Sequence, residues 1–121
     1  MDLNFFTDPG LAPKARSEIR IELLEVRPYP DGHRLQVELH ITPFLPNDRP
    51  SILITMLDST GKVIASTNII EAIQYSMHIT MHLPQQFHEK ELAVQTNLYF
   101  GDEPPQASTT KQVLLTEMTE P

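Results

Sequence analysis

Residues 34–41, Arg34-Leu35-Gln36-Val37-Glu38-Leu39-His40-Ile41, decide the fold class. Every second side chain in this stretch is aliphatic, and the residues between them are polar or charged. Strict alternation puts the aliphatic side chains on one face of a β-strand, whereas a helix would require apolar residues three and four positions apart. The stretch therefore predicts a strand with one buried face.

The same period extends toward the N-terminus. Aliphatic and charged residues alternate over 19–23, and the phase reverses at Leu24 and Val26. One extra residue in a strand flips the side of the sheet to which the following side chains point. We therefore expect a strand from Ser17 onward, with a β-bulge near Leu23-Leu24.

Toward the C-terminus, five further segments read as strands. Residues 51–57 are apolar at nearly every position, which predicts a central strand covered on both faces, or nearly so. Alternating patterns predict four more strands, at 62–67, 75–83, 92–100 and 110–117. Asn68–Ile73 fits either a strand or one helical turn. Turn-forming residues separate the strands at Tyr29–Gly32, Asp58–Gly61 and Gly101–Pro105.

Seven short strands in a chain of 121 residues predict one all-β domain. Sequential antiparallel strands must each hide one face, so we expect a two-sheet antiparallel sandwich. The predicted organisation is an extended N-terminal arm over 1–16, the β-sandwich over 17–118 and a polar tail over 119–121.

The pattern resembles an immunoglobulin-like or fibronectin type III-like domain at the level of architecture. The likeness is strongest in the second half, where Tyr75 to Leu83, Pro84, Leu92 to Phe100 and Val113 to Thr116 echo the last three strands of a fibronectin type III domain. The chain departs from these families because it has no Trp and no Cys pair, and it lacks the Tyr expected before the sixth strand. The resemblance implies a fold class and not a function.

Composition excludes several classes of function. The formal charge of −7 and the pI near 5.1 disfavour binding to nucleic acid and to anionic membrane surfaces. Without cysteine the chain offers no thiolate metal site and no cysteine nucleophile. No signal peptide or membrane-spanning stretch is visible, which predicts a cytoplasmic location.

The sequence predicts that the protein is not an enzyme and carries no metal or cofactor. It contains no Gly-x-Ser-x-Gly elbow and no Gly-rich phosphate loop. His78 and His82 are four residues apart on one strand, about 13 Å, which is too far to share an ion. A small hydrolase with a dispersed catalytic site remains an alternative, because such sites are defined by geometry rather than by spacing.

The leading hypothesis is a protein-interaction or accessory domain that binds a protein partner or a second copy of itself, for example as a homodimer. The predicted contacts are Phe5 and Phe6 of the arm, together with exposed sheet edges. An exposed sheet edge is expected to be protected by three prolines, Pro43, Pro46 and Pro50. The first and last strands contain few residues that would prevent a further strand from pairing with them.

A second hypothesis is a ligand-binding module for a glycan or calcium at one end of the sandwich. In the predicted strand 92–100, Tyr99 alternates with the apolar residues Leu98 and Phe100, which are expected to be buried. Its ring is therefore predicted to be exposed. The acidic pair Asp102 and Glu103 follows in the next loop, and carboxylates are ligands for calcium. These three residues are the predicted ligand-binding site.

Overall fold

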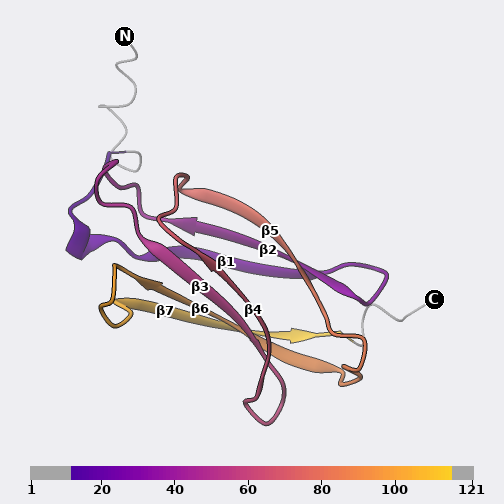
Figure 1. The fold of residues 1–121 in the computed structure, drawn as a ribbon. Coiled ribbons are helices and arrows are strands. Elements are labelled where there is room, and N and C mark those ends of the chain that lie inside the picture. Colours follow the sequence, from indigo (N-terminus) through magenta and orange to yellow (C-terminus); the bar gives the residue numbers. More distant parts are fainter. Residues whose placement is uncertain (1–11, 116–121) are drawn as a thin grey trace.

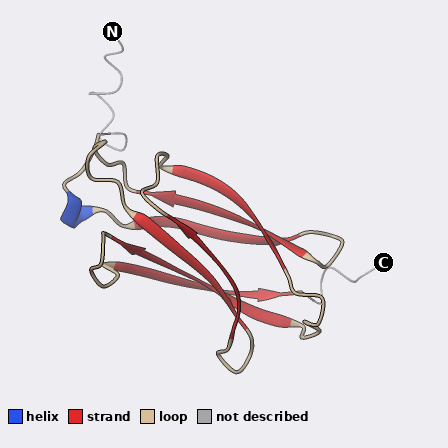
Figure 2. Cartoon of the chain, viewed as in Figure 1, coloured by secondary structure: helices blue, strands red, loops and turns tan. Residues whose placement is uncertain are grey.

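The computed structural model describes residues 12–115, which form two antiparallel β-sheets in two layers (Figures 1 and 2). A 3-10 turn, η1 (Arg16–Glu18), precedes the first strand. The strands are β1 (Ile21–Pro28), β2 (Arg34–Ile41), β3 (Ser51–Leu57), β4 (Val63–Ile69), β5 (Ser76–His82), β6 (Glu91–Tyr99) and β7 (Ala107–Leu114). The predicted seven-stranded, two-sheet fold is confirmed.

One sheet has the strand order β1-β2-β5 and the other the order β4-β3-β6-β7. The cleanest alternating stretch in the sequence, β2, is central in its sheet. The apolar stretch β3 is central in the other, as its pattern predicts. Neither strand can expose an edge, and both must bury their inner faces.

The core lies between the two sheets. Leu35, Val37 and Leu39 of β2 are fully buried, and they share one core cluster with Ile54 of β3 and Val94 of β6, which are also fully buried. Burying an aliphatic side chain stabilises the fold by about 1.5–3 kcal/mol. The aliphatic side chains of the alternating strands thus form the buried inner faces of the two sheets. Their burial supplies most of the driving force for folding.

The bulge in the first strand is real but lies earlier than predicted. The register of β1 against β2 shifts between Ile21 and Leu23, not at Leu23–Leu24. Beyond the shift, Leu24 faces inward opposite Leu39 and is buried. The change of phase in the sequence therefore marks the bulge to within two residues.

The strand also begins later than predicted, at Ile21 rather than Ser17. The backbone N–H of Glu18 donates to the carbonyl of Ala15, and that of Ile19 donates to the carbonyl of Arg16. These bonds close a turn in place of a ladder. Ile19 is nevertheless fully buried. The alternating sequence pattern therefore predicted the burial of Ile19 correctly but not its backbone conformation.

Residues 68–73 divide between two structures. β4 continues to Ile69, and the chain then bends at Glu71, which has a φ of 51°. The N–H of Ala72 donates to the carbonyl of Pro50 and anchors the loop, with Ala72 itself buried. The alternative of a helical turn is therefore wrong.

The turn between β3 and β4 is built around Asp58, as the sequence predicts. One oxygen of Asp58 accepts from the N–H groups of Thr60 and Lys62 and from the Thr60 hydroxyl, at 2.7–2.9 Å. Gly61 has a φ of 88°, a conformation that residues with a Cβ rarely adopt. The side-chain bond from Thr60 and the backbone bonds hold the pKa of Asp58 below its ordinary value of 3.8.

We expect Asp58 to contribute to acid stability. A carboxyl whose pKa is lower in the folded chain stabilises the fold above its unfolded pKa, and that contribution is lost as the pH falls through the folded value. Asp58→Asn keeps an acceptor oxygen but does not titrate. The free energy of unfolding in urea should therefore fall less steeply below pH 4 in the variant than in the parent, and parallel curves would contradict this role.

The described residues contain no helix with the length and apolar character needed to cross a bilayer.

Candidate functional site

Loops from both sheets meet at one end of the sandwich and enclose a cleft of about 600 Å³. The segment before β1, the β2–β3 loop, the β4–β5 loop and the β6–β7 loop all contribute to its lining. Binding sites are often built from loops that a rigid sheet holds in place. This loop-end cleft is the first candidate site.

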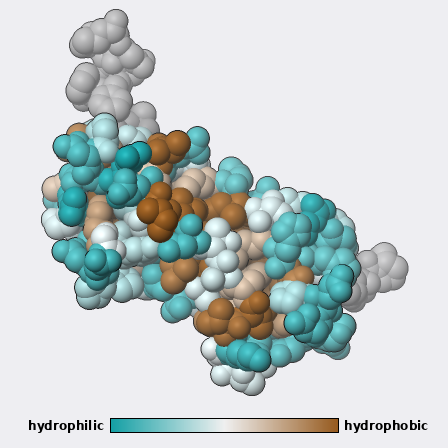
Figure 3. All heavy atoms as spheres, viewed as in Figure 1, coloured by the Kyte–Doolittle hydropathy of each residue, from teal (hydrophilic) through white to brown (hydrophobic). Residues whose placement is uncertain are grey.

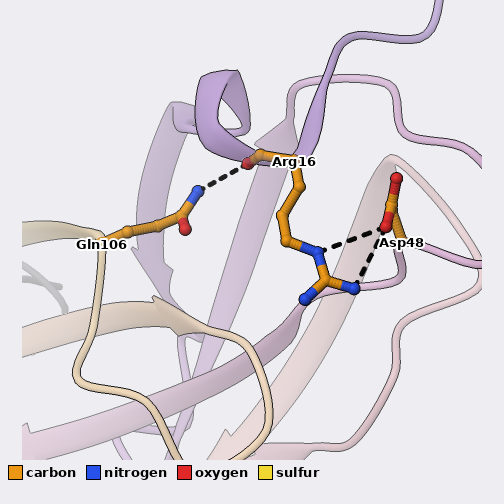
Figure 4. A network of polar contacts seen from close by, with 3 residues as sticks. All are labelled: Arg16, Asp48 and Gln106. Atoms are coloured by element: carbon orange, nitrogen blue, oxygen red, sulfur yellow. Dashed lines mark hydrogen bonds and ion pairs between the residues drawn. The ribbon is translucent and has the colours of Figure 1, made fainter.

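Arg16 forms one wall of the cleft and joins three segments. Its guanidinium contacts Oδ1 of Asp48 at 3.1 Å and lies 4.7 Å from the centre of the Phe100 ring. The carbonyl of Arg16 accepts from Nε2 of Gln106 at 2.9 Å (Figure 4). Arg16 and Gln106 thus tie the segment before β1 to the loop after β6.

Arg49 also lines this cleft. Its Nη2 atom is 3.3 Å from Oε1 of Glu71, whose backbone N–H donates to Oγ of Ser51. Both arginines of the cleft therefore already have a carboxylate partner. Exposed pairs of this kind are weak, and an anionic or polyhydroxyl ligand can compete with them.

Two of the three predicted ligand-binding residues reach this cleft. Tyr99 and Asp102 line it, and the Tyr99 hydroxyl donates to Oδ1 of Asn68 at 2.9 Å. Glu103 is not among the lining residues; its backbone N–H closes the turn by donating to the carbonyl of Phe100. The sequence reading missed Arg16 and Arg49, which come from loops distant in the chain.

Phe5 and Phe6, the predicted protein contacts, lie outside the described residues.

Histidines of β2 and β5 approach one another on the outer face of the three-stranded sheet. His78 is directly opposite Glu38, and Nε2 of His40 lies 2.9 Å from Oε2 of Glu38. Even so, residues 12–115 contain no group of three His, Asp or Glu side chains placed to hold a metal ion. Of the two histidines, His40 contacts Glu38 and His78 lies beside that pair in the register.

The outer face of the four-stranded sheet has a different character. Three neighbouring rows of side chains cross all four strands without an Asp, Glu, Lys, Arg or His: Asn68-Leu53-Asn97-Ser108, Ser66-Thr55-Gln95-Thr110 and Val63-Leu57-Ala93-Gln112. In this chain 21% of residues are charged, so a surface of this extent without charge is unusual. We call these three rows the uncharged face.

The opposite outer face shows the contrast. Its rows across β1, β2 and β5 are Glu25-Glu38-His78 and Arg27-Gln36-Thr80, and Nη1 of Arg27 lies 3.5 Å from Oε1 of Glu38. Charged residues are depleted from the cores of protein interfaces and are common elsewhere on protein surfaces. The uncharged face is therefore the second candidate site.

Comparison with known proteins gives a fold and not a family. No protein-family model matches the chain, and no curated protein sequence matches it. Among solved structures, it is similar to the β-glucuronidase of Parabacteroides merdae (TM-score 0.58, 13% identity) and to that of Lactobacillus rhamnosus (TM-score 0.51, 12% identity). The match covers 80% of this chain but only 14% and 16% of those enzymes. The chain thus shares the fold of a domain-sized part of these larger proteins.

Proposed function

We propose that this chain is a non-enzymatic accessory domain that binds another protein through the uncharged face. The observation that carries the proposal is the absence of ionisable side chains from three adjacent rows of that sheet. Removing charges from water is costly unless they are paired, so a face that lacks them can be covered by a partner with little desolvation penalty.

Two findings support an accessory role of immunoglobulin-like type. The strand orders β1-β2-β5 and β4-β3-β6-β7 support an immunoglobulin-like arrangement, with the fourth strand in the sheet of the third, sixth and seventh strands. The similar solved structures use the same fold for about one seventh of a larger enzyme. Both observations fit a domain that acts beside other domains or proteins.

A lysine at the centre of the uncharged face should abolish partner binding. Gln95 is half-buried between Thr55 and Thr110, so Gln95→Lys would put an unpaired charge in the middle of the interface. The tagged protein is used to capture partners from its native lysate, and these are quantified by mass spectrometry. We expect the variant to recover the partner at least about tenfold less efficiently, because central interface positions dominate binding energy.

The matched control is Gln36→Lys on the other sheet. Gln36 is also a half-buried glutamine on a central strand, but it lies between Arg27 and Thr80 on the charged face. The control should capture the partner as well as the parent protein does. Equal losses in the two variants, or no partner in any sample, would refute the assignment of the uncharged face.

The loop-end cleft supports a second candidate function, the binding of a glycan. Tyr99 and Asp102 line it together with Arg16, Arg49 and Asn47, a set of planar polar side chains suited to sugar hydroxyls. Calorimetric titration with a glycan panel tests this function, with Arg49→Ala as the variant expected to lose the signal. Absence of heat with every glycan would remove this candidate and leave the uncharged face unaffected.

A further inference from the structure

The four edge strands of the sandwich are protected to different degrees. β1 contains a bulge and ends at Pro28, and β7 carries Lys111 at an inward register position opposite Val94. Both devices discourage a further strand from pairing. The expectation that the first and last strands are the unguarded edges is therefore wrong. Pro43, Pro46 and Pro50 lie in the loop between two central strands and protect no edge.

β4 is a lightly protected edge, although its register against β3 shifts once, between Met56 and Leu57. Its sequence, Val-Ile-Ala-Ser-Thr-Asn-Ile over Val63–Ile69, contains no charged residue and no proline. β3 lies on one side of β4, and no strand of the described part of the chain pairs with its other side. An edge of this kind offers a row of backbone donors and acceptors to an incoming strand.

Exposed hydrophobic side chains flank β4 at both ends. Val63 is 55% exposed at its start, and Ile70, one residue beyond its end, is 63% exposed. Figure 3 shows hydrophobic patches on this side of the molecule, toward both ends of the strand. A groove of about 530 Å³, lined by Val63, Ile64 and Phe87 among others, adjoins its start.

We propose that two copies of this chain pair antiparallel through their β4 strands to form one continuous eight-stranded sheet. Full overlap of the two seven-residue strands puts the two-fold axis at Ser66, their central residue, opposite its own copy. Ala65 then faces Thr67 of the second copy. Each exposed end meets the other exposed end, which brings Ile70 of one copy beside Val63 of the other.

Charge complementarity favours a second copy as the occupant. In this register Lys62 lies opposite Ile70 of the second copy and one position from Glu71 of that copy. The two-fold symmetry places a second Lys62 near a second Glu71 at the other end of the paired strands. The Glu71 side chain is 64% exposed, so Lys62 would join its existing ion pair with Arg49. Two chains of net charge −7 repel each other over most of their surface, and pairing through an uncharged strand with opposite charges at its ends avoids that repulsion.

The other unguarded edge is β5, and it is less suitable. Ser76–His82 also lacks proline and formal charge, but none of the large exposed hydrophobic residues lies within it. Its outward side chains adjoin Arg34 and Glu38 of the charged face. We therefore assign the dimer to β4.

The test is sedimentation velocity on the full-length chain over a range of concentrations, and the parent protein should show reversible dimerisation. Ser66→Lys places two lysines with Cβ atoms about 5 Å apart across the axis and should weaken the dimer by about tenfold or more. Mixing the Ser66→Lys and Ser66→Glu proteins should restore a dimer containing one copy of each. A purely structural defect would not be rescued in this way.

Two control variants separate this proposal from its competitors. Thr80→Lys changes an exposed outward residue near the middle of β5 and should leave the dimer intact, as should Gln95→Lys on the uncharged face. A parent protein that stays monomeric throughout overturns the dimer without touching partner binding by the uncharged face. Dissociation by Thr80→Lys or Gln95→Lys, with Ser66→Lys still dimeric, overturns the assignment to β4.

Discussion

Ile54→Ala should lower the free energy of unfolding by about 2–5 kcal/mol, the range measured for large-to-small substitutions in well-packed cores. Ile54 has no exposed surface and lies on the inner face of β3, opposite Thr67 of β4 and Thr96 of β6. Since strands flank it on both sides, its neighbours have little freedom to collapse into the space. The loss is measured as a shift of the urea unfolding midpoint at unchanged slope.

The adjacent residue provides the control. Leu53 follows the opposite phase of β3, lies on the outer face and is half-buried. Leu53→Ala removes a comparable aliphatic side chain from a site that water can already reach, so its cost should be clearly smaller. Equal losses at the two positions would mean that the two faces of β3 are equally covered, which contradicts the burial described above.

These two positions also show where sequence reasoning succeeds. The strand over 51–57 was predicted from its apolar composition, and the strand over 34–41 from its period. Both predictions depend only on local patterns, because burial of one or both faces leaves a periodic trace in the sequence. The turn at Gly61 is equally local, since its positive φ favours glycine.

The candidate sites could not be predicted in the same way. Tyr99 and Asp102 were found because they are close in sequence, whereas Arg16 and Arg49 reach the same cleft from separate loops. β3 and β4 contain no charged residue, but neither strand alone reveals how far the uncharged face extends. Each of its rows takes one residue from each of four strands, and their pairing is set by the strand order and register.

The second large effect has the opposite sign: Thr96→Val should raise the free energy of unfolding by about 1–3 kcal/mol. Thr96 is fully buried on the inner face of β6, in the series Leu92, Val94 and Leu98. Its hydroxyl has no hydrogen-bond partner among the described residues. A buried polar group without a partner costs its full desolvation penalty, and valine fills nearly the same volume without that group.

Urea unfolding of Thr96→Val against the parent protein measures this gain, and Thr109→Val is the matched control. Thr109 lies opposite Thr96 on the edge strand β7 and is half-exposed, so water already satisfies its hydroxyl and little should change.

Because Ile54 faces Thr96 directly, the double variant Ile54→Ala with Thr96→Val should not be additive. The Ile54→Ala cavity gives the Thr96 hydroxyl room for a water, so the valine should gain less stability there than in the parent core. A Thr96→Val protein less stable than the parent would show that the hydroxyl has a partner in solution.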